Sequence, residues 1–420
     1  MLEKYLQRNA FKAALIQERP KDQLGLIVVI PASDEDSLIP SVESLLKCEN
    51  TVCDCEIIVV FNASIEAEDE IMKRNINAAD QLKEFTKSRI SKHLKVHILC
   101  FNDLPSKHAG VGLARKIGMD EAVRRFQEID NEKGIIVCFD ADTKCEPEYL
   151  RTIEQEFKRT PNTKAATIHF EHPISGNEYS KEVYENIVWY ELHLRYYKNG
   201  LAYAKLPCAF HTIGSSMAVR ANAYAAQGGM NRRKAGEDFY FLQKFMGIGG
   251  LFNILSTKTT PSPRPSHRVP FGTGKAIQQS LECQKDLRFS YAFDVFENLK
   301  QMFNSVSKWY ISKPSNVELL VDFIGQETFD QQLMKLRKLS KNEKDFKRRF
   351  FVWMNAFKVL KFVHYLRDHH FPNAQLLIEV PKLLTSMGHK VDSEDDSKRL
   401  LAQMRFLDKN EINSHNVDAK

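Results

Sequence analysis

Long apolar runs are missing from this sequence. The longest near-continuous apolar stretches, such as Leu24 to Ala32, reach only about half the length of a membrane-spanning helix. The segment from Met1 to Pro20 carries a charge every few positions, unlike the apolar core of a signal peptide. We therefore expect a cytoplasmic protein without transmembrane segments, for which peripheral contact with a membrane surface stays open.

Cysteine is sparse, with 8 residues in a chain of 420. Cys48, Cys53 and Cys55 lie close together, but no second pair follows them at the spacing of a zinc finger or zinc ribbon. Reduced structural thiols are therefore favoured over a zinc or redox role.

A dominant charge of one sign is also absent, because 60 Lys and Arg are interspersed with 54 Asp and Glu, for a net charge of +6. This balance gives no support for nucleic-acid binding. The apolar content of 43% in 420 residues supports two or three folded domains and excludes a chain that is disordered throughout.

Short apolar runs without polar alternation punctuate the chain up to Asp140, which is the pattern of strands buried on both faces. Helix-length segments separate these runs, so the sequence predicts an α/β fold with a mainly parallel central sheet. Ligands of such sheets bind beyond the carboxyl ends of the strands. The predicted strands are Leu26 to Ile30, Glu56 to Phe61, Val96 to Phe101 and Gly134 to Phe139, and the helices between them are Ser37 to Lys47, Glu66 to Ser91 and Val111 to Phe126.

The pattern changes further along the chain. Lys164 to Phe170 and Phe210 to Val219 read as strands, and prolines from Thr257 to Gly274 predict a long loop. The rest is rich in charge and poor in Gly and Pro, as expected of helices. We predict an α/β domain over residues 1–275, with an N-terminal helix over residues 1–24, and a helical C-terminal domain over residues 276–420.

Two carboxylates follow the fourth predicted strand directly. Residues two apart in extended backbone point the same way, so Asp140 and Asp142 can address one hard cation, such as Mn²⁺ or Mg²⁺. A solvated turn that caps the next helix is the alternative interpretation.

A second candidate lies at Gly110, Gly112 and Arg115, which open a predicted helix. Free backbone amides and a guanidinium at this helix start would face a pyrophosphate. A surface charge on the helix is the alternative for Arg115. A dinucleotide fingerprint is disfavoured, because Arg115 stands where its third glycine would be.

Five segments in order resemble the family 2 inverting nucleotide-sugar glycosyltransferases, which include cellulose, chitin and hyaluronan synthases. The resemblance covers about two thirds of the chain, and it implies a GT-A type fold and transfer of a sugar from a nucleotide-diphosphate donor to an acceptor hydroxyl, with Mn²⁺ or Mg²⁺. The acceptor would be a sugar, a lipid-linked molecule or another hydroxyl compound. The segments are Ile27 to Glu35, Glu56 to Ser64, His108 to Gly118, Asp140 to Asp142, and Gly236 to Asp238.

The resemblance also implies roles for single residues. Asp238 would be the catalytic base that deprotonates the acceptor, with Glu237 beside it as support or as the base; stabilisation of a helix N-terminus is the alternative for both. The other implied roles are a nucleoside pocket at Pro31, Glu35 and Asn62, a metal site at Asp140, Asp142 and His267, diphosphate contacts from Arg115, Arg264 and Arg268, and close substrate approach at Gly214.

The sequence differs from the family at Phe61 to Ser64, where many relatives have an acidic residue that pairs with uracil, so the base of the donor stays open. Two other functions remain as alternatives. A sugar nucleotidyltransferase is disfavoured because the segment after the first strand is acidic, at Asp34 and Glu35, rather than rich in Gly and Lys. A non-catalytic nucleotide-sugar-binding or interaction protein would not require Asp140, Asp142 and Asp238 together.

Overall fold

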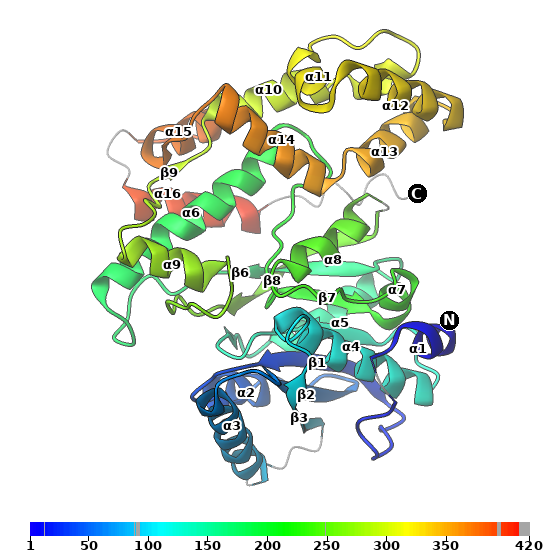
Figure 1. The fold of residues 1–420 in the computed structure, drawn as a ribbon, viewed down its shortest axis with the longest axis vertical. Helices are drawn as coiled ribbons and strands as arrows, with labels where there is room; N and C mark the ends of the chain where they lie inside the picture. The colour runs from blue at the N-terminus through cyan, green and yellow to red at the C-terminus, as the bar shows by residue number, and fades with distance from the viewer. Residues whose placement is uncertain (12, 88, 90–92, 248, 393–395, 411–420) are drawn as a thin grey trace.

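The structure is a computed structural model that describes residues 1–11, 13–87, 89, 93–247, 249–392 and 396–410. Within this part of the chain, an eight-stranded sheet has the order β3-β2-β1-β4-β7-β6-β8-β5. The parallel half is formed by β1 (Leu24–Ala32), β2 (Asp54–Ser64), β3 (Leu94–Leu104) and β4 (Ile135–Cys138). The predicted α/β fold with a mainly parallel sheet is therefore confirmed (Figure 1).

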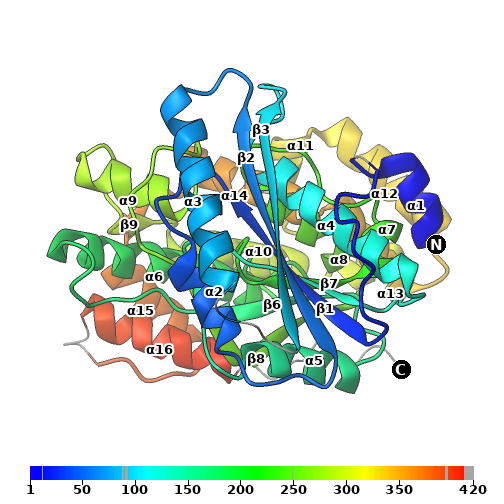
Figure 2. The same cartoon turned by 90° about the horizontal axis from the view of Figure 1, so that it is seen from below.

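Helices cover both faces of this half of the sheet. Alternate residues of β1 point to opposite faces, so Ile27 and Val29 join the core on the side of α4 (Val111–Glu128), while Val28 joins the opposite core. That opposite core receives α2 (Ile39–Leu46), α3 (Asp69–Lys87) and α5 (Tyr149–Arg159). Figure 2 shows α2 and α3 on one side of the strands and α4 on the other.

The second half of the sheet is mixed in direction. It contains β6 (Ala165–Phe170), β7 (Met217–Arg220), β8 (Leu251–Thr260) and the short β5 (Lys144–Cys145). β7 runs antiparallel to β4 and β6, whereas β6 and β8 are parallel to each other. β6 therefore runs in the same direction as β1 and β4, and its carboxyl end lies at the same edge of the sheet.

β8 was not predicted, because the sequence placed a loop from Thr257 onward. Thr257 and Thr259 are buried and belong to the strand, as suits β-branched side chains. The proline-rich loop is therefore shorter than expected and covers residues 261–272, before α9 (Thr273–Leu281).

The N-terminal helix is also shorter than predicted. α1 (Leu2–Asn9) ends well before β1, and the chain then continues without helix. The backbone amides of Phe11, Leu15 and Ile16 donate instead to carboxylates of α4. Side chains of α4 thus accept the hydrogen bonds that a longer helix would have formed within its own backbone.

The remainder of the described chain is helical, as predicted, apart from the two-residue strands β9 (Phe289–Ser290) and β10 (Ala374–Gln375). The predicted boundary between residues 275 and 276 falls within α9, and residues 411–420 of the predicted domain lie outside the described residues. The helices after α9 are α10 (Phe293–Phe303), the 3₁₀ helix η1 (Val306–Tyr310), α11 (Glu318–Ile324), α12 (Gln326–Leu339), α13 (Glu343–Trp353), α14 (Ala356–His369), α15 (Leu376–Ser386) and α16 (Ser397–Lys409).

One long helix links the two halves of the chain. α6 (Lys181–Tyr203) follows β6 in sequence, yet it packs against α9, α10, α15 and α16 (Figure 1). Apolar side chains from Val188 onward in α6 share one continuous core with α4 and the C-terminal helices, whereas Val183 and Ile187 pack in a smaller cluster with α9. A membrane-spanning helix, as judged by length and apolar character, is not found in the described part of the chain.

Candidate active site

The predicted acid pair lies on a turn directly after β4. The hydrogen bonding of β4 continues to Phe139, whose amide donates to Val29 of β1, so Asp140 emerges at the carboxyl edge of the sheet. The turn is held from α2, where the Ser41 hydroxyl donates to the carbonyl of Asp140 at 3.1 Å. The side chains of Asp140 and Asp142 are each about one third exposed, so both carboxylates are available to a ligand.

Arg115 of α4 connects this turn to a segment far away in the sequence. One guanidinium nitrogen lies 2.7 Å from Asp140, and Nε lies 3.4 Å from the carboxylate of Glu237. The side chain is 1% exposed. Arg115 therefore differs from its predicted place facing a pyrophosphate, because its guanidinium is buried and neutralises carboxylates on both sides.

Gly214 explains how this arginine fits. Its carbonyl oxygen accepts a second hydrogen bond from Arg115, from Nη1 at 2.7 Å. A Cβ atom at position 214 would lie 2.9 Å from the other terminal nitrogen of the guanidinium, which is too close for a real contact. Gly214, which was predicted to allow close approach of substrate, thus allows close approach of the Arg115 side chain in this structure.

The predicted base motif forms the start of α8 (Glu237–Met246). Gly236 is the N-cap, with φ of 68°, a left-handed conformation that glycine adopts readily. Glu237 is buried against Arg115, whereas Asp238 is half-buried, and its carboxylate accepts a hydrogen bond from the amide of Phe239.

Desolvation, together with the negative charge of Glu237, raises the pKa of Asp238 to about 7, although Arg115 opposes this shift. Asp140 also contributes to the electrostatic environment of Asp238, so the two acid motifs converge. A carboxylate with a pKa near neutrality can accept a proton efficiently at physiological pH.

The proline-rich loop reaches the same region from the other side. Arg264 lies 2.7 Å from Glu35 and 3.5 Å from Asp142, while Arg268 forms an ion pair with Glu35 and donates to the carbonyl of Ser33 at 2.8 Å. Both arginines are about one third exposed. The two arginines for which diphosphate contacts were predicted are therefore placed next to the acid pair.

The loop also reaches the base motif through an aromatic side chain that the sequence did not single out. A Cβ atom added to Gly236 would lie 2.9 Å from the ring of Phe271, so this ring lies directly over the start of α8. Phe271 is 57% exposed. A conspicuous aromatic residue in a Gly- and Pro-rich loop was the available signal.

We use the name acidic cluster for Glu35, Asp140, Asp142, Glu237 and Asp238. Within the described chain, Arg115, Arg264 and Arg268 are its paired cations, so two negative charges stay uncompensated when all five carboxylates are ionised. Desolvation raises the pKa of Glu35, Asp140 and Asp142 despite these arginines. Additional positive charge would therefore stabilise the ionised form of the acidic cluster.

The predicted nucleoside-pocket residues lie at the ends of β1 and β2. Pro31 is a buried residue inside β1, paired in register with Val60. Asn62 is 2% exposed, and its side-chain amide donates to the carbonyl of Ala32 at 3.0 Å. Asn75 of α3, which the sequence did not single out, donates to the carbonyl of Asn62 and ties α3 to this strand end.

His267 is placed differently from its predicted role as a metal ligand. Its side chain is 64% exposed, and Nε2 lies 3.6 Å from Glu282, which is outside the acidic cluster. Nowhere in the described residues do three or more His, Cys, Asp or Glu side chains converge in a way that could hold a metal ion. A metal bound by Asp140 and Asp142 would therefore take its remaining ligands from substrate or water.

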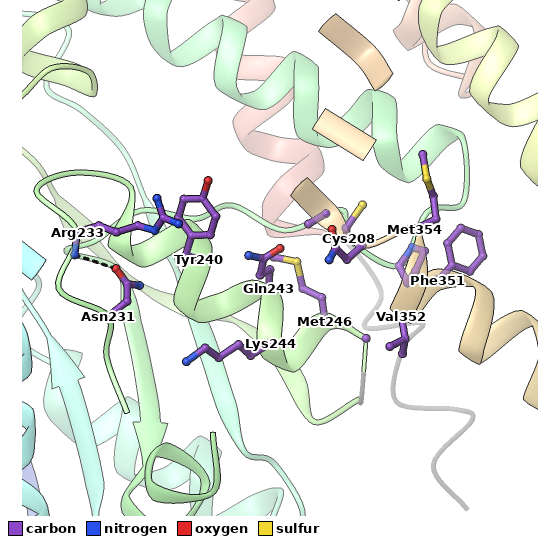
Figure 3. Close-up of a pocket in the computed structure, with 14 residues that line it drawn as sticks. Cys208, Asn231, Arg233, Tyr240, Gln243, Lys244, Met246, Phe351, Val352 and Met354 are labelled. Atoms are coloured by element: carbon purple, nitrogen blue, oxygen red, sulfur yellow. Dashed lines mark hydrogen bonds between the residues drawn. The ribbon is translucent and has the colours of Figure 1, made fainter. Parts of the chain in front are cut away.

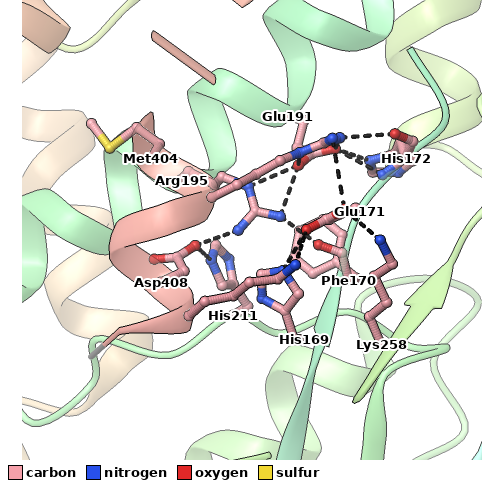
Figure 4. Close-up of polar contacts among 12 residues, drawn as sticks. His169, Phe170, Glu171, His172, Glu191, Arg195, His211, Lys258, Met404 and Asp408 are labelled. Carbon is pink, nitrogen blue, oxygen red and sulfur yellow. Dashed lines mark hydrogen bonds and ion pairs between the residues drawn. The ribbon is translucent and has the colours of Figure 1, made fainter. Parts of the chain in front are cut away.

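A buried polar network behind the site was not foreseen from the sequence. Asp408 of α16 forms an ion pair with Arg195 of α6 and a hydrogen bond with His211 at 3.0 Å (Figure 4). Arg405, also on α16, contacts Glu191 of α6 at 2.7 Å. Because His211 precedes Gly214 by three residues, the network anchors the segment that carries the Arg115 contact.

No local pattern could have revealed this network. Its partners are separated by about two hundred positions, and the charged residues of α6 and α16 each look in sequence like ordinary charges on a helix.

Comparison with known proteins adds independent information. The model of the family described as Glycosyl transferase family group 2 matches residues 135–281, which include the acid pair, the base motif and the proline-rich loop. A search of curated protein sequences finds no match.

Solved structures of TarS from S. aureus are similar to this chain, with low sequence identity and low TM-scores. TarS 1-349 in complex with UDP-GlcNAc has 13% identity and a TM-score of 0.38, over 77% of this chain and 89% of that one. TarS 1-349 without a named ligand has 14% identity and a TM-score of 0.37 over the same shares.

The resemblance seen in the sequence is thus confirmed where the family model matches, on the segment that holds Asp140, Asp142 and Asp238. The chain is a glycosyltransferase whose residues 135–281 match the family described as Glycosyl transferase family group 2.

Proposed function

We propose that the protein transfers a sugar from a nucleotide-diphosphate sugar to an acceptor hydroxyl, with inversion at the anomeric carbon and with a divalent metal ion. The observation that carries this proposal is the double contact of Arg115 with Asp140 and Glu237. It joins the motif expected to bind a metal to the motif expected to supply the base. Such a juxtaposition is what a single displacement at one sugar carbon requires.

The acidic cluster fits a divalent cation on two grounds. Its carboxylates outnumber its guanidinium groups by two, so the charge of Mn²⁺ or Mg²⁺ would balance it. Mg²⁺ in enzymes is commonly held by one or two carboxylates, with phosphate oxygens and water as further ligands. Asp140 and Asp142 would hold the ion, and when bound it would neutralise charge on the departing diphosphate.

Arg264 and Arg268 would bind the diphosphate of the donor. Both guanidinium groups now neutralise Glu35, and they are exposed enough to exchange that partner for phosphate oxygens. Bidentate contacts between arginine and phosphate are strong and directional. Together with the metal ion, they would stabilise the leaving group as its negative charge develops.

Asp238 would act as the base. Its pKa of about 7 means that near neutral pH it is partly deprotonated and still basic enough to accept the proton of an acceptor hydroxyl. Glu237 cannot readily take this role, because it is buried against Arg115. Glu237 would instead hold Arg115 and raise the pKa of its neighbour.

Donor binding is tested with a panel of nucleoside diphosphates, with and without Mn²⁺, scored by the shift of the thermal unfolding temperature. We expect at least one nucleotide to stabilise the protein only when Mn²⁺ is present. Asp142→Asn should abolish that metal-dependent shift. The matched control Glu178→Gln removes an exposed carboxylate, 65% accessible, that pairs with Lys144 close to the same turn, and it should leave the shift unchanged. An Asp142→Asn variant with the full metal-dependent shift would contradict the metal proposal.

Catalysis is tested with the nucleotide sugars of the base that binds, by following release of the nucleoside diphosphate. Asp238→Asn should retain the thermal shift with nucleotide and Mn²⁺ but lose release by a factor of about 10²–10⁴, the usual contribution of a general base. For the unmodified protein, the rate at low substrate should rise with pH through about 7 as Asp238 loses its proton. Near-normal turnover by Asp238→Asn would assign the base to another residue.

A further inference from the structure

A cavity separate from the acidic cluster lies along the other side of α8. Its volume is about 450 Å³, and it is enclosed by α8 and the segment before it on one side and by α13 and the start of α14 on the other (Figure 3). None of the five carboxylates of the acidic cluster lines it. A volume of this size suits a small organic ligand.

One wall of this cavity is apolar. Met246 comes from the end of α8, whereas Phe351 and Met354 come from the end of α13 and the turn after it. Thioether side chains adapt to irregular apolar shapes, and an aromatic ring offers a flat contact surface. This wall fits an apolar body, such as a ring system or a short hydrocarbon chain.

The opposite wall carries positive charge without a compensating acid. Arg233 and Lys244 both line the cavity, and its described lining contains no Asp or Glu. Lys244 already donates to the carbonyls of Gln227 and Gly229, each at 3.0 Å. Arg233 is the available cation of the two.

The guanidinium of Arg233 is held in place but not neutralised. It lies over the ring of Tyr240, with 3.7 Å between the guanidinium carbon and the ring centre. No ion pair joins Arg233 to a carboxylate within the described chain. The stacked geometry keeps the guanidinium edge free for an oxyanion, because stacking uses only its face.

A further polar group next to the cavity lacks a partner. The side-chain oxygen of Gln243 is buried and accepts no hydrogen bond from any described residue. A buried acceptor without a donor destabilises the folded chain, so a ligand donor that reached it after a small rotation of the amide would recover free energy.

We propose that this cavity is a binding site for a small organic anion with an apolar body, whose anionic group pairs with Arg233. The charge of the lining selects the anion, and Phe351, Met246 and Met354 receive the body. The proposal does not depend on the function of the acidic cluster. An occupant would rest against Tyr240, two residues after Asp238 on the same helix.

The probe for the test is 8-anilinonaphthalene-1-sulfonate, an aromatic anion whose fluorescence rises in apolar surroundings. The comparison probe is N-phenyl-1-naphthylamine, which has the same ring system without the sulfonate. We expect the anion to bind the unmodified protein saturably with one site per chain. Loss of a charge-assisted contact corresponds to a roughly 10- to 100-fold weaker affinity.

The variant Arg233→Gln should weaken binding of the sulfonate by at least about tenfold. Its matched control is Arg232→Gln, which removes the neighbouring arginine, exposed like Arg233 but outside the cavity lining, and which should stay within about twofold of the unmodified protein. Binding of the uncharged probe should not change in either variant. Equal sulfonate affinity in the two variants, or equal loss for both probes, would overturn the proposal.

A second variant tests where the sulfonate binds, by a substitution on the opposite wall of the cavity. Val352 lines the cavity and is 46% exposed, so Val352→Asp adds a carboxylate at the rim without opening the core. It should also weaken sulfonate binding about tenfold or more, because like charges repel across the small cavity. Ile311→Asp places the same charge at a position 75% exposed outside the lining, and it should have no effect. Unchanged binding by Val352→Asp would place the sulfonate elsewhere.

Discussion

Replacing Arg115 by methionine is the most direct test of how the acidic cluster is held together. Methionine keeps much of the length and the apolar stem but removes the guanidinium. The change leaves the carbonyl of Gly214 without its donor and leaves Asp140 and Glu237 without their cation. Glu237 suffers most, because its side chain is only 5% exposed.

The magnitude follows from these contacts. Removing one partner of a buried ion pair typically costs about 3–5 kcal/mol of the free energy of unfolding. The contact with Asp140 counts for less than a buried pair, because this carboxylate is about one third exposed and partly screened by water. We therefore expect a loss of about 3 kcal/mol at pH 7.5, the lower end of that range.

The loss should depend on pH in a defined direction. Desolvation already raises the pKa of Asp140 above its ordinary value, and removing Arg115 takes away the charge that opposes this shift. A carboxyl whose pKa is higher in the folded than in the unfolded state stabilises the fold when protonated, and this stability is lost as pH rises through the folded pKa. The deficit of the variant should therefore be larger at pH 8 than at pH 5.

Urea unfolding followed by tryptophan fluorescence measures both effects. Arg151→Met is the control, since Arg151 pairs with Glu49 at 2.8 Å but both side chains are about half exposed, so its loss should stay below about 1 kcal/mol. A deficit for Arg115→Met that is below 1 kcal/mol, or that does not change between pH 5 and pH 8, would refute the electrostatic account of this residue.

Three further predictions concern the supports of the site. Gly214→Ala should lower the free energy of unfolding by about 1–3 kcal/mol in urea titrations, because its Cβ would press on the buried guanidinium of Arg115. Asp408→Asn should cost about 3–5 kcal/mol by the same measurement, whereas Asp286→Asn, in an exposed pair, should cost less than about 1 kcal/mol. Neighbouring cations hold the pKa of Asp408 and Glu191 well below the ordinary range, so stability should fall with pH below about 4, and the unfolding temperature of Asp408→Asn should fall less steeply there than that of the unmodified protein.

The parallel half of the sheet was predictable because its strands are buried on both faces and carry unbroken apolar runs. The start of the proline-rich loop was not predictable. β8 ends in threonines and a lysine, which join the strand by pairing with β6 and do not form an apolar run that the sequence would reveal. The length of the N-terminal helix was predicted wrongly for a related reason. Its amides are satisfied by carboxylates of α4, and no local propensity reports such a contact.

The candidate site shows the same division. Asp140, Asp142 and Asp238 could be proposed from position and resemblance, since each follows a strand or opens a helix at the expected edge. The position of the Arg115 side chain could not be predicted, because an arginine at the start of a helix looks the same in sequence whether it faces a phosphate or is buried between two carboxylates. Burial and partners are tertiary properties, and they decide what a charged side chain does.

The ion pairs of α16 impose an order of events on synthesis. Arg195 and His211 are translated long before Asp408, and until the last described helix has left the ribosome, Arg195 lacks the Asp408 carboxylate that neutralises it and His211 lacks its hydrogen-bond partner. The segment that leads to Gly214 is therefore fixed only after α16 has been made. Nascent chains halted before α16 should remain sensitive to proteases around His211, even though every residue of the acidic cluster is already present.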